Sequence, residues 1–318
     1  MKRIFARLQE LLEKKQDAVL AVITAAEGST PRGAGAVMLV SRDGLEAGTI
    51  GGGALERLSI ETARELIRSQ KSAFHEFDLQ GGGQEATGMV CGGKASVFFQ
   101  YINASDPSWA ELADRMCEAL SAGRQGSLLL SLDGSFPSFE EGKERLHTSP
   151  VLSEGQFALP VHSGERAVLF GAGHCAAALA PILHSVGFRV FVLDDREELL
   201  TRERFPHAEE RICWHYGRIS EHLLLEEDDY IVIMTSGHVH DCEVEEQVLR
   251  MDFPYVGVIG SRKKTAVVNA RLREKGISEE KLQSVHTPIG LAIDAVTPEE
   301  IAVSIAAEMI QVRARQRG

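Results

Sequence analysis

The chain has 318 residues, the length of about two domains, and a hydrophobic content of 44% is enough for a sizeable core. Its 34 Lys and Arg against 46 Asp and Glu give a net charge of −12, which argues against nucleic acid and anionic membranes as partners. We expect no signal peptide, no membrane span and a cytoplasmic location, because the first residues are charged and amphipathic. Five scattered cysteines without a C-x-x-C motif predict neither a disulfide framework nor a cysteine-built zinc site.

The first half of the chain predicts an α+β domain over residues 1–135. Apolar spacing predicts helices over 2–15, from about 54, and from a capping box at Ser108 and Glu111 to about 122. We expect Leu55, Leu58, Thr62 and Leu66 to form the buried stripe of the second helix. Apolar runs and turn residues predict strands at 18–26, 35–40, 45–50, 74–79, 95–102 and 128–132.

Three loops of this domain combine glycine with polar groups. The first is 27–33, with Glu27, Ser29 and Arg32, and the second is the run Gly51-Gly52-Gly53, followed by Glu56. Glycines between a strand and a helix let backbone N–H groups approach an anion at the helix N-terminus. In the third loop Cys91 precedes Gly92, Gly93 and a lysine, an environment that favours the thiolate. The alternative is that these glycines only shape turns and that Cys91 is a small buried hydrophobe.

Residues 136–163 are rich in Gly, Ser, Pro and charge, which predicts a connection with one short strand. The segment 166–195 follows, with a buried strand over 167–170 and the G-x-G-x-x-G/A fingerprint from Gly171 and Gly173 to Ala176. A helix and a second strand then lead to Asp194 and Asp195. These acids lie 21 and 22 residues beyond Gly173, where a ribose-binding carboxylate is expected.

The rest of the chain alternates strands and helices, which predicts a right-handed parallel sheet and a Rossmann-like domain over 164–318. We expect strands at 188–193, 211–214, 230–234 and 255–259, and helices at 174–186, 241–251 and 262–275. Thr297, Pro298 and Glu300 predict the start of a last helix with Ile301, Ile305, Met309 and Val312 on its buried face.

Further polar groups follow the strands of this domain, at the edge where open α/β sheets bind ligands. His174 occupies a variable position of the fingerprint, and His238 and Asp241 follow the strand at 230–234. No third, distant ligand accompanies the two histidines of this segment, so we predict no metal site. Ser261 and Arg262 begin the helix after 255–259, where cations oppose the helix dipole and indicate an anionic ligand or an acidic contact.

Nine segments together resemble the XdhC/CoxI family, the accessory proteins of xanthine dehydrogenase and related molybdenum hydroxylases. They are EGSTPRGAGAVMLV, GTIGGGALE, CGGK, FGAGH, LDDRE, TSGHVHD, IGSRKK, HTPIGLAI and TPEEIAVSIAAEMI. The resemblance implies an N-terminal XdhC/CoxI domain, a C-terminal Rossmann domain and a homodimer. It also implies transient binding of molybdenum cofactor (molybdopterin), help with its sulfuration by a cysteine desulfurase, and insertion into a xanthine dehydrogenase-type hydroxylase. Ala54 departs from the Cys that usually follows the three glycines, so Cys91 is the preferred thiol.

We therefore expect a cofactor chaperone without catalytic residues of its own. The alternatives are an NAD(P)-dependent oxidoreductase that uses the Rossmann domain, and a nucleotidyl- or sulfur-transfer enzyme acting on molybdopterin. The expected cofactor-binding residues are Glu27, Ser29, Arg32, Gly51, Gly52, Gly53, Glu56, Cys91, Gly92, Gly93, Gly171, Gly173, His174, Asp194, Asp195, His238, Asp241, Ser261 and Arg262.

Overall fold

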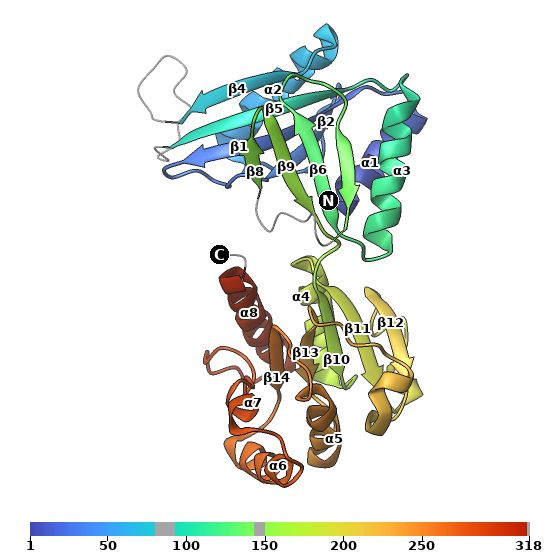
Figure 1. Ribbon diagram of the computed structural model, residues 1–318, viewed down its shortest axis with the longest axis vertical. Helices are drawn as coiled ribbons and strands as arrows, with labels where there is room; N and C mark the ends of the chain where they lie inside the picture. Colours follow the sequence, from blue (N-terminus) through green and yellow to red (C-terminus); the bar gives the residue numbers. More distant parts are fainter. Residues whose placement is uncertain (80–92, 143–149, 317–318) are drawn as a thin grey trace. The chain divides into compact units, whose positions relative to one another are not determined.

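The computed structural model of the chain describes residues 1–79, 93–142 and 150–316, with the side chain of His238 left out (Figure 1). Contacts divide the chain into two compact units, Met1–Ser163 and Gly164–Gly318, and each is described by itself. Among the helices of the described residues, none is long and apolar enough to cross a membrane.

Unit 1 contains two antiparallel sheets. The first sheet has the order β3-β2-β1-β5-β4 and the second has the order β7-β6-β9-β8. The strands of the first sheet are β1 (Ala18–Glu27), β2 (Val37–Ser41), β3 (Leu45–Gly48), β4 (Ala73–Asp78) and β5 (Lys94–Ile102). Those of the second sheet are β6 (Gly126–Ser131), β7 (Ser138–Glu141), β8 (Val151–Ser153) and β9 (Gln156–Val161).

The segment 136–163 differs from the connection that we predicted. It supplies three of the four strands of the second sheet, and the boundary between the units lies after Ser163. Phe157, Leu159 and Val161 on β9 are buried with the rest of the core of unit 1. Alternation of apolar residues along β9 therefore holds this segment in the unit, although its Gly, Ser and Pro content is typical of a linker.

Three helices cover the first sheet of unit 1. α1 (Lys2–Glu13) and α3 (Pro107–Ser121) share one apolar core with the second sheet, and α2 (Gly53–Ser69) packs against the opposite face in a separate core. Two details correct the sequence prediction. The α2 stripe is Leu55, Ser59, Ala63 and Ile67, and the cap of α3 is Asp106, whose carboxylate accepts the Ser108 N–H at 3.0 Å.

Unit 2 is built on one parallel sheet with the order β12-β11-β10-β13-β14. Its strands are β10 (Arg166–Phe170), β11 (Arg189–Asp194), β12 (Ala208–Cys213), β13 (Tyr230–Ile233) and β14 (Tyr255–Val258). Numbered along the unit, this is the order 3-2-1-4-5 of the Rossmann fold, and it confirms the predicted fold class. Beyond β14, His286 extends the sheet edge through a parallel bridge to Gly257.

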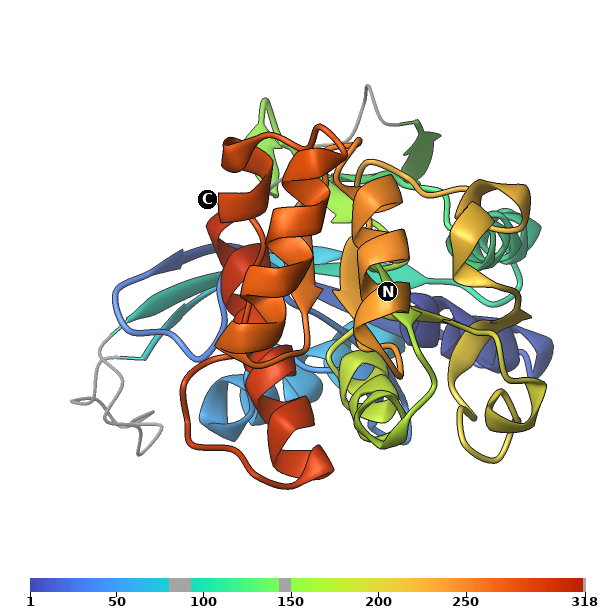
Figure 2. The same cartoon turned by 90° about the horizontal axis from the view of Figure 1, so that it is seen from below.

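Helices cover both faces of this sheet (Figure 2). α4 (His174–Ser185) and α8 (Pro298–Gln316) pack on one face, whereas α5 (His238–Val248) and α6 (Arg262–Glu274) pack on the other with the short α7 (Glu279–Gln283). Short 3-10 turns lie at Glu197–Leu199 and Tyr216–Glu221. The predicted capping box of α8 is confirmed, because Glu300 N–H donates to Thr297 and the Glu300 carboxylate accepts Thr297 N–H.

Candidate functional site

The fingerprint loop of unit 2 lies where the strand order reverses, between β10 and β13. Gly171 has a φ of +110°, and a Cβ there would lie 2.7 Å from the Met234 carbonyl carbon at the end of β13. Only glycine therefore lets the two loops approach this closely. This switch point at the carboxyl edge is the usual ligand position in an open α/β sheet.

Two helices begin at this edge with a glycine that has open space beside its Cα. Gly173 caps α4 and Gly237 caps α5, neither helix has a side-chain cap, and no atom lies within 4 Å of a Cβ built on either glycine. The amides of a helix start form a favourable place for an anion. His174 is exposed at the first position of α4. By contrast, the start of α6 is already capped by the Ser261 hydroxyl, and Arg262 is exposed.

The carboxylate of Asp194 is fully buried and ties the end of β11 to the fingerprint loop. It accepts the Ala172 N–H at 2.7 Å, the Arg196 N–H at 3.0 Å and the Arg196 guanidinium at 2.9 and 3.0 Å. Burial alone would raise the pKa of Asp194, but these hydrogen bonds hold it below its usual value. Its acceptor positions are thus used within the protein, whereas Asp195, the other acid of the predicted pair, is exposed.

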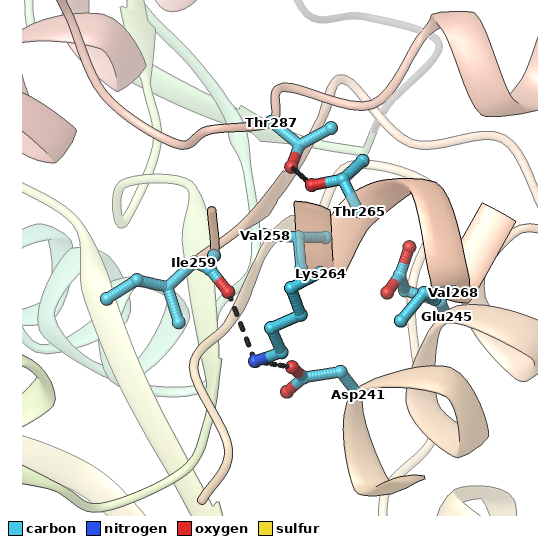
Figure 3. A pocket seen from close by; sticks show the side chains of 9 residues that line it. Asp241, Glu245, Val258, Ile259, Lys264, Thr265, Val268 and Thr287 are labelled. Atoms are coloured by element: carbon cyan, nitrogen blue, oxygen red, sulfur yellow. Dashed lines mark hydrogen bonds and ion pairs between the residues drawn. The ribbon is translucent and has the colours of Figure 1, made fainter. Parts of the chain in front are cut away.

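Asp241 is also fully buried, and it joins two loops of the same edge. The Thr235 hydroxyl after β13 donates to Asp241 at 2.5 Å, and the Lys264 ammonium of α6 forms an ion pair with the other carboxylate oxygen (Figure 3). Lys264 also donates to the Ile259 carbonyl at 3.4 Å. The basic first turn of α6 is therefore explained in part by an acidic contact, the second of the two predicted alternatives.

A small pocket lies beside this ion pair, and Glu245 lines it with Thr265 and Thr287. The Glu245 side chain is buried, with 3% of its surface exposed. Burial and the nearby charge of Asp241 raise the pKa of Glu245 to about 8, although Lys264 opposes the shift. Glu245 was not among the predicted site residues, and nothing in its sequence context marks it as buried.

The three glycine-containing loops of unit 1 come together as far as the structure describes them. A Cβ on Gly51 would lie 2.5 Å from Pro31 of the first loop, and a Cβ on Gly93 would lie 2.5 Å from the carbonyl oxygen of Glu27. Glu27, Ser29 and Arg32 are exposed on the loop between these two glycines. The first loop therefore lies between the second loop and Gly93, the described end of the third.

The triple-glycine loop forms a nest of donors around the carboxylate of Glu56. One oxygen of Glu56 accepts the Ile50 N–H at 3.2 Å, the Gly52 N–H at 3.3 Å and the Thr49 hydroxyl. Gly51, Gly52 and Gly53 all have positive φ, which directs successive amides to this side of the loop. The donors of this loop are thus directed at the carboxylate of Glu56, which we had expected to be one of the cofactor-binding residues.

The structure does not describe every residue that we predicted to be part of a site. Cys91 and Gly92 lie outside the described residues, as does the side chain of His238. Ala54, at the position of the usual Cys, is buried in the first turn of α2. Within the described part of the chain, no three His, Cys, Asp or Glu side chains form a group suited to a metal ion.

Two arginines near the fingerprint were also not predicted as part of this region. The Arg196 guanidinium donates a hydrogen bond to the Asp194 carboxylate, and the Arg204 guanidinium donates to the Ala172 carbonyl at 3.0 Å. Arg196 directly follows the acidic pair, so an i, i+2 contact to Asp194 was the signal available in the sequence. Arg204 lies far from the loop in the sequence, and no local pattern indicates its contact.

These features define a class of protein: an α/β protein of two units, with a nest of hydrogen-bond donors in unit 1 and a Rossmann-type parallel sheet in unit 2. A family model described as the XdhC Rossmann domain matches residues 167–309, and one described as the XdhC and CoxI family matches residues 11–78. The chain belongs to the XdhC and CoxI family.

Three curated relatives extend over nearly the whole chain. Uncharacterized protein YqeB of Escherichia coli is 30% identical over 98% of this chain, which spans 46% of the length of YqeB. A probable xanthine dehydrogenase subunit of Bacillus subtilis is 28% identical, with 97% of each chain covered. Molybdenum cofactor insertion chaperone PaoD of Escherichia coli is 23% identical over 96% of this chain and 87% of its own.

A solved structure shows the same fold. The crystal structure of a xanthine dehydrogenase from Bacillus halodurans matches with a TM-score of 0.82 and 28% identity. The match covers 99% of this chain and 96% of that chain.

Proposed function

We propose that this protein is an accessory protein that binds molybdenum cofactor, supports its sulfuration and inserts it into a xanthine dehydrogenase-type molybdenum hydroxylase. The observation that carries the proposal is the convergence of the loops at Pro31, Gly51 and Gly93 beside the donor nest of unit 1. The name of the relative PaoD, a molybdenum cofactor insertion chaperone, supports the same role.

The nest fits the phosphate of molybdopterin. The Glu56 carboxylate stands in for an anionic oxygen and shows that two backbone amides and one hydroxyl converge on a single acceptor. Open space beside Gly52, where no atom lies within 4 Å of a Cβ, leaves room in front of the loop. When bound, the cofactor supplies the oxidised metal centre and its sulfur chemistry, and the chain supplies binding and release.

The remaining parts of the proposal rest on the sequence. Cys91 is the thiol that we assign to sulfur handling with a cysteine desulfurase, because it precedes two glycines and a lysine. A carrier must release its cargo, so a few amides and one thiolate suit the role better than a closed metal cage. A homodimer and a hydroxylase partner complete the proposed assembly.

The direct test is co-migration of cofactor with the full chain. Anaerobic incubation with molybdenum cofactor, gel filtration and metal analysis should recover molybdenum with the protein peak. Loaded protein should then activate an apo-hydroxylase of the xanthine dehydrogenase type. Absence of molybdenum from the peak at micromolar protein would refute cofactor binding.

The sulfur-handling role has its own test. Cys91→Ala should lower the transfer of labelled sulfur from a cysteine desulfurase, whereas Cys117→Ala, on α3, should leave it unchanged. Equal transfer in both variants would remove Cys91 from the role and leave cofactor binding untouched.

The second candidate is an NAD(P)-dependent oxidoreductase. The strand order of unit 2 and the open glycine caps of α4 and α5 favour a nucleotide at the switch point. The full occupation of Asp194 by Ala172 and Arg196 counts against the usual ribose contact. Saturable quenching of NAD(P)H fluorescence with hydride transfer to an acceptor would support this candidate, and its absence would dismiss it.

A further inference from the structure

The last helix of the chain, α8, has apolar residues on two opposite sides. The residues of one side are buried in the core of unit 2: Ala302, Ile305, Met309 and Val312. On the other side, Val303 has 51% of its surface exposed and Ile310 has 38%. A helix at the surface of a soluble protein normally presents charged and polar residues on the side away from the core, and a helix that is apolar all round is normally buried. The outward side of α8 therefore has the composition of a covered surface.

The polar side chains in the middle of α8 are used within unit 2. Three of the four between Val303 and Ala314 bind groups of this unit: Ser304, Glu308 and Arg313. Glu308, for example, accepts the Tyr255 hydroxyl at 2.6 Å. In this fully described stretch, the exposed Gln311 is the remaining polar side chain. The helix thus directs most of its polar groups inward and leaves apolar groups outside.

The outward apolar residues have the spacing of a coiled-coil seam. Val303, Ala307, Ile310 and Ala314 are separated by four, three and four positions, which is the spacing of a and d residues. At about 3.6 residues per turn, the four lie within about 60° of one another around the helix axis. We call this set the α8 stripe. Residues with this spacing pack against a second helix.

The α8 stripe is complementary to a second copy of itself in the antiparallel direction. When two stripes are aligned by their centres, Val303 lies opposite the partner's Ala314, and Ala307 lies opposite the partner's Ile310. Each larger side chain then meets an alanine, which leaves room for close packing. The first turn of α8 is acidic and its last turn is basic, so antiparallel packing brings opposite charges together at both ends.

We propose that the α8 stripe is the contact surface of a homodimer, in which two copies of α8 pack antiparallel across a two-fold axis. Such a contact is isologous, because each copy uses the same surface. Val296, directly before the helix, is 81% exposed and extends the apolar surface at one end of the stripe. The proposal rests on the homodimer of the proposed function and names its surface. It involves no residue of the donor nest, so dimerisation and cofactor binding can be measured separately.

The first test is sedimentation equilibrium of the full chain over a dilution series. The wild type should be a dimer at micromolar concentration. Ile310→Asp should raise the dissociation constant of the dimer at least about 100-fold, because each copy would place an unpaired carboxylate in the contact. The matched control is Val267→Asp, which also replaces an exposed valine on a helix of unit 2 but lies on α6, and it should leave the constant unchanged. Circular dichroism checks that both variants fold.

The second test measures the register of the two helices. Val303→Cys and Ala314→Cys chains, mixed and then oxidised, should give a disulfide-linked dimer that contains one copy of each variant. Each variant alone should give no more linked dimer than the wild type, which controls for the native cysteines. Linkage in Val303→Cys alone would overturn the antiparallel arrangement.

The outcomes separate this proposal from the proposed function. A dimer that persists in folded Ile310→Asp, without the mixed disulfide, would overturn the α8 surface and leave a homodimer formed elsewhere. A wild type that stays monomeric at every concentration would overturn both the surface and the homodimer, and the stripe would then belong to a different partner. Neither result changes the outcome of the molybdenum co-migration test.

Discussion

The substitution Asp194→Asn tests whether one buried carboxylate holds the fingerprint loop to the sheet. Asparagine keeps the shape of the side chain but loses the charge that four hydrogen bonds from Ala172 and Arg196 share. In addition, the NH2 group of the asparagine side chain would face one of the N–H groups of Ala172 or Arg196, and two donors cannot bond to each other. Arg196 is partly exposed and recovers some hydration, so we expect a loss of about 3 kcal/mol in the free energy of unfolding of unit 2.

The assay is urea unfolding followed by tryptophan fluorescence. The chain has two tryptophans, Trp109 in unit 1 and Trp214 in unit 2, so a Trp109→Phe background makes the signal specific to unit 2. The matched control is Asp195→Asn, because Asp195 is exposed and lies 3.8 Å from the Arg196 guanidinium. We expect the control to change the free energy of unfolding by less than about 0.5 kcal/mol.

The pH dependence gives the sign of the same effect. Because the pKa of Asp194 is lowered in the folded state, the unfolded chain binds the proton more readily in acid. The contribution of Asp194 is therefore complete above the ordinary carboxyl pKa and is lost as the pH falls through the lowered one. Asp194→Asn should lack this part of the acid transition. Equal stability of Asp194→Asn and Asp195→Asn at pH 7 would refute the reasoning.

Two further predictions concern the glycine loops. Gly171→Ala should lower the free energy of unfolding of unit 2 by about 3 kcal/mol or more, because φ is +110° and the new Cβ would lie 2.7 Å from the backbone of Met234. Gly173→Ala should fold normally, because its new Cβ enters open space. The same urea titration checks both, and equal losses would contradict the close approach of the two loops at Gly171. Glu56→Gln should lower the stability of the start of α2 by about 1 kcal/mol and should speed hydrogen exchange of the amides in the loop before it. The control Glu61→Gln, which removes a charge from the exposed side of α2, should change neither. Unchanged exchange in Glu56→Gln would show that the carboxylate does not hold the nest.

Much of unit 2 could be predicted from the sequence, because its strands are short apolar runs separated by helical patterns. The strand from Ala208 begins earlier than expected because its first half, with Glu209 and Glu210, is exposed at the edge of the sheet. Unit 1 was harder to predict. β8 is exposed along its whole length, so neither alternation nor hydrophobicity marks it, and its strand state depends on pairing with β9.

The candidate sites also combine features that could be predicted from the sequence with features that could not. That the glycines form tight loops could be predicted, because positive φ and close approach of the backbone restrict such positions to glycine. The directions of charged side chains were not. Glu56 turns back to its own loop, and Lys264 turns inward to Asp241, yet each belongs to a polar segment that is typical of a solvated helix start. Such contacts depend on packing between elements, which local sequence patterns do not carry.

The carboxylate of Glu56 means that the nest of unit 1 always has an anion available. In the proposed function, an incoming phosphate would exchange with this carboxylate rather than fill a set of unpaired amides. The affinity of the nest for an anion is then a difference between two similar sets of hydrogen bonds, and it is smaller than the strength of either set. Departure of the anion leaves no donor unsatisfied, because the side chain returns to it. Under the proposed function, loading and unloading at this loop would therefore take place between two states that both satisfy its donors, which would suit transfer rather than storage.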